Sequence, residues 1–162
     1  MDQALDTYNR LLAALPAGDA RHLPAVRARA ALLGSCNRLD AALADLDAIC
    51  AADRDDMDAR YSRACLRLSL AARRRGEGSR PTGAGAAPDR KAEDEARRGA
   101  EAALRDLDAV VAADPAHCRA MIRRRAACAL LGRPLPADPL ILKQTLLLER
   151  GQVCRAPRRA WG

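Results

Sequence analysis

Aromatic residues are almost missing from this sequence, which holds no phenylalanine, one tryptophan and two tyrosines among its 162 residues. Proteins that bind single-stranded nucleic acid stack the bases on aromatic side chains, so the composition disfavours that class. Histidine is equally scarce, because only His22 and His117 are present, which leaves little material for zinc sites or nucleophilic triads. No apolar run approaches the roughly 20 residues that a membrane span needs, so we expect no span.

Cysteine is present, but not in a spacing typical of metal sites or redox sites. No two of the six cysteines form a C-x-x-C pair. They are scattered among alanines and leucines, which favours small buried side chains in a reducing compartment over a disulfide framework. The N-terminus lacks the pattern of a secretory signal. We therefore expect a cytoplasmic protein with no metal and no cofactor, whose cysteines are Cys36, Cys50, Cys65, Cys118, Cys128 and Cys154.

The rest of the composition is typical of a globular protein with a positive charge. Hydrophobic residues make up 49% and charged residues 30%, which excludes wholesale disorder. The formal net charge of +7 favours acidic partners such as acidic peptide tails, nucleic acid or an anionic membrane surface. The alternative interpretation is that the excess arginine is only a compositional bias.

An internal repeat is the strongest signal in the chain. Residues 41–53 and 102–114 are identical at ten of thirteen positions, and two of the three differences exchange one apolar residue for another. In the first copy Ala42, Leu46 and Ile49 are spaced by four and three, which places them on one face of a helix.

A second helix is predicted near each copy, separated from it by a turn rich in aspartate and proline. These second helices are expected at about 24–34, 57–75 and 116–131, and a weaker copy of the repeat occupies residues 4–16. No segment alternates with a period of two, so the repeating unit is a pair of antiparallel helices. The sequence therefore predicts an all-α fold.

This pattern resembles the tetratricopeptide repeat family, which repeats a 34-residue unit of helix A, turn and helix B. Three kinds of residue carry the resemblance: the alanine of helix B (Ala4, Ala42 and Ala103), the small residue of helix A (Ala30 and Ala64) and the proline of the closing turn (Pro16 and Pro115). The middle copy has Arg54 in place of that proline. The resemblance covers about residues 1–132 and implies a solenoid of about three repeats.

The second repeat is longer than the family pattern. Ala103 follows Ala42 by 61 residues, and the excess over 34 falls between the two helices of that repeat. Because glycine, proline and serine dominate residues 76–85, we expect a flexible insertion at about 75–90.

The end of the chain carries a further predicted helix. Asp138 is a good N-cap, Pro139 is a good first helical residue, and several leucines follow, so we expect an apolar helix over 138–150 that caps the last repeat. The alternative is an exposed helix that binds a partner or a membrane surface. We assign the helical array to residues 1–150 and a basic disordered tail to 151–162.

Motifs for catalysis are missing. Asp45 and Asp47, like Asp106 and Asp108, are spaced by two, and such neighbours point to different sides of a helix, so we expect solvated positions and no catalytic dyad. The sequence contains no phosphate-binding glycine loop, no nucleophile elbow and no H-E-x-x-H motif. We predict that the protein is not an enzyme.

The resemblance also implies a concave groove lined by the A helices. Co-chaperones of the family hold the acidic C-terminal tail of heat-shock chaperones there, in a clamp of basic residues and asparagines. Arg27, Arg119 and Arg123 match the basic positions of the clamp, while Ala31 and Ser62 occupy the asparagine positions. Arg119 and Arg123 are four residues apart on one helix face, so two guanidinium groups can chelate one carboxylate.

Tyr61 and Ile122 are expected to add apolar contacts in the same groove. The sequence thus predicts an interaction module or adaptor that binds a short acidic peptide or a partner helix, with a chaperone-linked adaptor as its most specific form. One alternative is a structural subunit of a larger assembly. A second, less favoured alternative is an electrostatic RNA-binding protein, because acidic residues interrupt any basic stripe along the B helices.

Overall fold

The computed structural model describes residues 2–16, 18–78 and 90–134, and every regular element in these ranges is an α-helix. The predicted all-α fold of paired helices is therefore confirmed for this part of the chain. Its six helices are α1 (Asp2–Ala14), α2 (His22–Ser35), α3 (Leu39–Ala52), α4 (Met57–Gly78), α5 (Arg90–Ala113) and α6 (Cys118–Leu131). The predicted helix 138–150 and the predicted tail lie outside the described residues.

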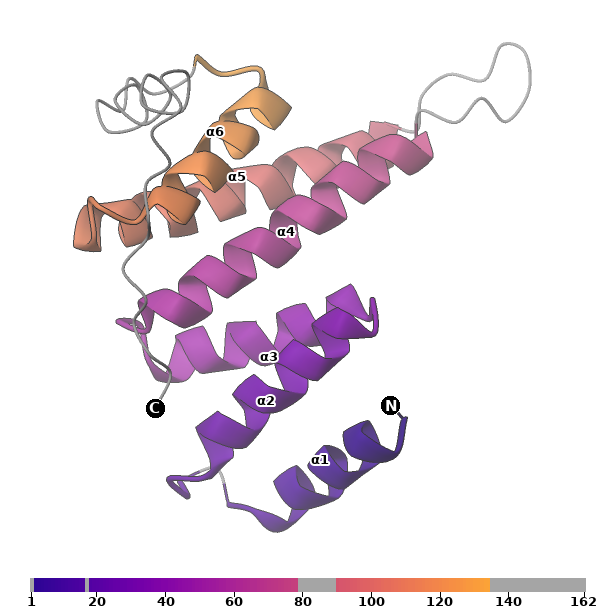
Figure 1. Ribbon diagram of the computed structural model, residues 1–162. Helices are drawn as coiled ribbons and strands as arrows, with labels where there is room; N and C mark the ends of the chain where they lie inside the picture. The colour runs from indigo at the N-terminus through magenta and orange to yellow at the C-terminus, as the bar shows by residue number, and fades with distance from the viewer. Residues whose placement is uncertain (1, 17, 79–89, 135–162) are drawn as a thin grey trace, which may run out of the picture.

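The helices pack in the order in which they follow along the chain. Each helix contacts the next one, and the most extensive contact joins α4 to α5. Figure 1 shows the result as a stack that rises from α1 to α6. A contact also joins α4 to α6, so these two helices lie side by side in the stack.

The repeated apolar positions form the core. Ala42, Leu46 and Ile49 of α3 are each at most 4% exposed, as predicted from their spacing. The equivalent residues of α5 are buried to the same degree, and they are Ala103, Leu107 and Val110. Because alanine occupies the first position in both helices, the neighbouring helix approaches closely there.

The first copy of the repeat departs from this pattern. Ala4, which matches Ala42 in the sequence, is exposed, while its neighbour Leu5 is buried against Leu33 and Ala42. Within the described ranges helix α1 packs chiefly on α2, which covers one of its sides. Ala4 lies on the other side, and Leu5 takes over as the buried residue.

The turns before α4 and α6 are built alike. Asp53 Oδ1 accepts a hydrogen bond from the backbone N–H of Asp55, and Asp114 Oδ1 accepts one from the N–H of Ala116, both at 2.9 Å. Aspartate bonds readily to the backbone two residues further on, and this local bond ends the preceding helix.

The next helix then begins with a side-chain cap at the same place in both repeats. Asp56 Oδ1 accepts from the N–H of Ala59 at 2.8 Å, and His117 Nδ1 accepts from the N–H of Ala120 at 3.1 Å. Both caps satisfy an N–H group that the first turn of a helix leaves without a backbone partner. His117 is an unusual cap, so its role was not evident from the sequence.

Part of the predicted flexible insertion at about 75–90 is wrong, because the long helices α4 and α5 extend into it. They have 22 and 24 residues, against 14 each for α2 and α3. Residues 76–78, which were predicted to open a loop, are the last residues of α4, and residues 79–89 are not described. Figure 1 shows that the added turns of α4 and α5 project together beyond the end of α3. We call residues 71–78 and 90–99 the arm.

Candidate peptide-binding face and its arginine–aspartate ladder

The predicted binding residues come mainly from α4 and α6. Arg119, Ile122 and Arg123 are exposed on α6, and Ile122 has 59% of its surface open to solvent. Tyr61 lies on α4, where its ring is 5.0 Å from the ring of His117 and tilted by 42°. This contact joins the beginning of α6 to α4, so side chains of both helices contribute to one surface.

The hydroxyl of Tyr61 links the two helices electrostatically. Burial raises the pKa of Tyr61 above its ordinary value and the neighbouring Cys65 thiol raises it further, whereas the Arg123 guanidinium lowers it. At neutral pH the phenol is therefore an uncharged hydrogen-bonding group beside a cation. Ser62 follows it on α4 and is exposed. We call Tyr61, Ser62, Arg119, Ile122 and Arg123 the α4–α6 face.

Arg27 differs from the arginines of α6. Its guanidinium donates a hydrogen bond to Asp56, the residue that caps α4. Burial by itself would raise the pKa of Asp56, but the hydrogen bond from the Ala59 N–H and the Arg27 cation outweigh it and lower the pKa. Arg27 thus already has a carboxylate of its own.

Arg119 and Arg123 have no such carboxylate partner in the part of the chain that the structure describes. There, no carboxylate oxygen lies within ion-pair distance of either guanidinium. Of the three arginines in the predicted clamp, the structure therefore leaves these two exposed on α6 and pairs the third.

A set of ion pairs that sequence reasoning missed runs through the stack. Arg29 of α2 donates to both oxygens of Asp45 on α3, at 2.8 and 2.6 Å, and also to Asn9 Oδ1 of α1 at 3.0 Å. The pKa of Arg29 is raised chiefly by this bond to Asp45. One guanidinium thus ties three consecutive helices together.

The same arrangement recurs one repeat later. Arg63 of α4 donates to both oxygens of Asp106 on α5, at 2.8 and 2.6 Å, and to Asp47 of α3 at 3.1 Å. Arg67, one turn further along α4, bridges the same two carboxylates at 2.8 Å each. The pKa of Arg63 is raised, mainly by the hydrogen bond to Asp106.

The final step of the series joins Arg124 of α6 to Asp108 of α5 at 2.6 Å. Each of the four arginines therefore bonds to the helix before it, and the first three also bond to the helix after it. We call this series the ladder, and its members are Asn9, Arg29, Asp45, Asp47, Arg63, Arg67, Asp106, Asp108 and Arg124.

The ladder shows that one prediction about the aspartates is wrong and that another is correct. Asp45 and Asp106 were predicted to be solvated, but they are only 6% and 7% exposed. The expectation that aspartates spaced by two face different sides is correct, since Asp45 bonds to α2 while Asp47 bonds to α4. The signal that could have found the ladder is the 16-residue separation between Arg29 and Asp45, which recurs between Asp47 and Arg63.

Most of the described cysteines contribute to packing. Cys50 and Cys128 are buried in the core, as predicted, while Cys36, Cys65 and Cys118 are half-buried. Among the described residues, no group of three or more histidine, cysteine and acidic side chains could hold a metal ion. No helix in those ranges is long and apolar enough to cross a membrane.

Comparisons with protein-family models, with curated proteins and with solved structures give no match to this chain.

Proposed function

We propose that this protein is a tetratricopeptide-like interaction module whose α4–α6 face binds a short acidic peptide of a partner protein. The proposal combines the internal repeat of the sequence with the consecutive packing of paired helices. The ladder supports a repeat architecture, since the same three-helix contact occurs around Arg29 and Arg63.

The observation that carries the proposal is the state of Arg119 and Arg123. They are four residues apart on an exposed side of α6, and among the described residues neither has a carboxylate within ion-pair distance. By contrast Arg27, Arg29 and Arg63 are all paired. A carboxylate of a peptide would supply the missing counter-charges through two charge-assisted hydrogen bonds.

The neighbouring side chains fit a peptide better than a small anion. Ile122 lies between the two arginines in the sequence and offers an exposed apolar surface, and Tyr61 offers a ring and a neutral hydroxyl. A peptide residue with an apolar side chain would cover Ile122 while an adjacent carboxylate bonds to Arg123. Because helices hold all these groups in place, little ordering entropy opposes binding.

A chaperone tail is the most specific form of the proposal. The asparagine positions of the family clamp hold Ala31 and Ser62 here, so two amide donors are replaced by a methyl group and a hydroxyl. Each hydrogen bond to a charged group contributes about 1.5–3 kcal/mol. We therefore expect weaker or differently oriented binding of a terminal carboxylate, in a cytoplasmic setting, than the family clamp provides.

The test is fluorescence anisotropy with a labelled acidic peptide that ends in a free carboxylate and with the same peptide amidated. We expect the free acid to bind more tightly, and we expect the double variant Arg119→Ala/Arg123→Ala to lose that preference. The double variant Arg38→Ala/Arg105→Ala is the matched control, since both arginines are exposed and lie outside the face. Equal loss in the control would mean only general attraction to a basic protein and would reject the site.

The second candidate function is a structural subunit of a larger assembly. It is favoured by two large apolar side chains on the surface, Ile122 at 59% and Leu11 at 42% exposure, since such residues are often covered in complexes. Sedimentation over a wide concentration range tests it, because a subunit that loses its partner tends to self-associate or to lose stability on dilution. A steep salt dependence of RNA binding would instead favour the RNA-binding alternative.

A further inference from the structure

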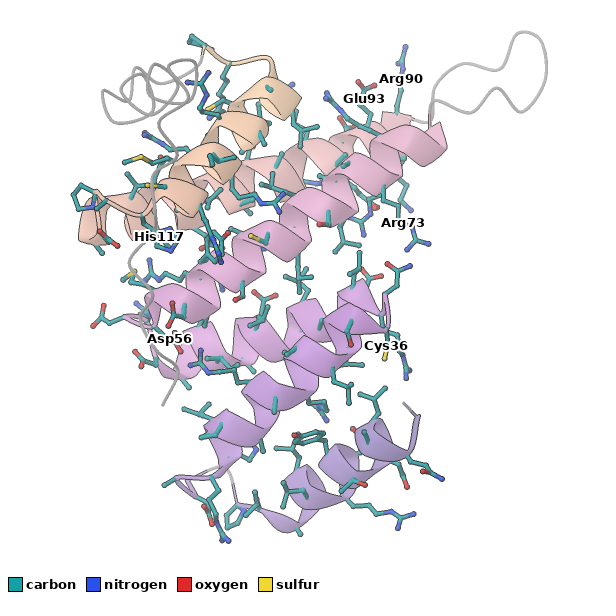
Figure 2. The ribbon with its side chains drawn as sticks, viewed as in Figure 1. Cys36, Asp56, Arg73, Arg90, Glu93 and His117 are labelled. Carbon is teal, nitrogen blue, oxygen red and sulfur yellow. The ribbon has the colours of Figure 1, made fainter. Side chains whose placement is uncertain are left out.

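The arm forms a cleft with the end of α3, away from the α4–α6 face. This cleft has a volume of about 290 Å³ and is lined by Leu43, Arg67, Leu70, Ala71, Arg74, Glu95, Arg98 and Gly99. Figure 2 labels Arg73, the residue before Arg74 of the lining. Arg73 lies at the opposite end of the molecule from His117 and Asp56. The cleft and the α4–α6 face are therefore separate surfaces near opposite ends of α4.

The floor of the cleft is apolar. Leu70 and Ala71 of α4 are almost fully buried beneath it, and Leu43 of α3 lies at its side. Gly99 of α5 faces α4 here, and a Cβ atom at this position would make ordinary van der Waals contacts, 3.7 Å from the backbone oxygen of Arg67 and 3.9 Å from the Cβ of Ala71. A larger side chain at this position would occupy the space between the helices.

The rim of the cleft carries three arginines, which differ in how closely carboxylates approach them. Arg67 is held by Asp47 and Asp106 at 2.8 Å each. Arg74, in contrast, is 3.8 Å from Asp40 and 3.7 Å from Glu95, distances too long for hydrogen bonds. Arg98 is exposed and has no carboxylate within ion-pair distance in the described ranges.

We propose that this cleft is a second docking site, which takes an acidic peptide segment of a partner protein that carries one large apolar side chain. The apolar side chain would rest on Leu70 and Ala71, and the flanking carboxylates would bond to Arg74 and Arg98. Two arginines of the rim select this occupant: Arg98 has no carboxylate within ion-pair distance among the described residues, and the two ion pairs of Arg74 are too long for hydrogen bonds, so a peptide carboxylate would gain hydrogen bonds from both.

The other occupants fit the cleft less well. Residues 151–162 of the chain itself carry arginines and no acidic residue, so like charges would meet. The volume is at the lower limit of typical small-molecule sites, which span about 300–1,000 Å³. Nucleic acid is disfavoured because the lining contains no aromatic side chain on which bases could stack.

The probe is a fluorescent pentapeptide with a central leucine flanked by two glutamates on each side, acetylated and amidated so that it has no terminal charges. Two companion peptides replace the leucine by serine or the glutamates by lysines. The proposal predicts that the full-length protein binds the first peptide and that both replacements weaken binding at least about tenfold. Backbone amide signals of Leu43 and Gly99 should shift when the first peptide is added.

The variant Arg74→Glu/Arg98→Glu should weaken binding of the first peptide about tenfold or more, since two attractive charges become repulsive. Arg105→Glu is the matched control, because Arg105 lies seven residues beyond Arg98 on α5, is also exposed and is outside the cleft. It should change the affinity less than about twofold. Because all these substitutions are at the surface, they should leave the fold intact.

The proposal is overturned by no binding of the leucine peptide, by equal binding of the serine peptide, or by equal losses in Arg74→Glu/Arg98→Glu and in Arg105→Glu. If Arg119→Ala/Arg123→Ala abolishes binding of this peptide while Arg74→Glu/Arg98→Glu leaves it unchanged, the peptide occupies the α4–α6 face instead. That result would reject the cleft and leave the proposed function standing.

Discussion

Aspartates that look alike in the sequence have different roles, because the helices around them differ. Asp106 is 7% exposed and bonds to two arginines of α4, while Asp108 bonds to one, Arg124, among the described residues and has a side chain that is 47% exposed. When a buried carboxylate with two guanidinium partners is removed, those cations are left with fewer counter-charges, here with Asp47 as the remaining carboxylate partner among the described residues. Removing one partner of an exposed ion pair costs little stability, because water replaces the missing partner.

The first prediction concerns these two aspartates. Asp106→Asn should lower the free energy of unfolding by about 2–3 kcal/mol, because Arg63 and Arg67 remain half-buried with fewer counter-charges. Asp108→Asn, the same change two residues away, should cost less than about 1 kcal/mol. Urea denaturation of both variants measures the difference, and similar losses would show that the ladder is not a stabilising network.

The second prediction concerns the titration of Tyr61. Because the Arg123 cation lowers the pKa of Tyr61 against the effect of burial, Arg123→Ala should move that pKa further above its ordinary value. A folded-state pKa above the unfolded value contributes stability that is complete below about pH 10 and is lost as the pH rises through the folded-state pKa. Phenolate absorbance, recorded in a Tyr8→Phe background so that only Tyr61 titrates, gives the shift. An unchanged or lower pKa of Tyr61 would show that the Arg123 cation does not act on the Tyr61 hydroxyl.

At the scale of the helices, the sequence predicts most of what the structure contains. The helix predicted at 57–75 is found at Met57–Gly78, and the one predicted at 116–131 is found at Cys118–Leu131. Helical spacing of apolar residues is a local property, so the positions of the helices and their buried sides follow from it. The ladder does not follow so easily, because Arg63 and Asp106 meet across 43 residues that include the enlarged segment.

The arm shows a second limit of the sequence patterns. Glycines at 76 and 78 and the serine and proline that follow suggested a loop, yet α4 continues to Gly78. The helix thus continues despite the low helix propensity of glycine. The side-chain cap at His117 was also missed, because histidine is not among the usual N-cap residues.

The third prediction tests the close approach of helices at the repeated alanines. Ala103 is fully buried where α5 meets its neighbours, so Ala103→Leu should destabilise the protein by about 2 kcal/mol through overpacking. Ala4 occupies the matching position of α1 but is exposed, so Ala4→Leu should change stability by less than about 0.5 kcal/mol. Thermal unfolding compares the two variants. A large cost at Ala4 would mean that a further surface covers that side of α1.

On the scale of the whole molecule, charge is distributed unevenly. Within the stack several arginines are used in ion pairs, as Arg29, Arg63 and Arg67 illustrate. The exposed cations without a close carboxylate among the described residues include Arg119 and Arg123 on the α4–α6 face and Arg98 on the rim of the cleft, but also residues outside both surfaces, such as Arg38 and Arg105. The net charge of +7 favours acidic partners in general, and the two surfaces are where neighbouring apolar side chains add to that attraction.

The most direct test of the central claim is a charge exchange between the α4–α6 face and its peptide. Affinities would be measured by fluorescence anisotropy for an acidic peptide and for its lysine counterpart, with the wild-type protein and with Arg119→Glu/Arg123→Glu. We expect the wild type to prefer the acidic peptide and the variant to prefer the basic one. A variant that keeps the wild-type preference would contradict the proposed peptide-binding face, because the arginines of α6 would then not be the residues that contact the peptide.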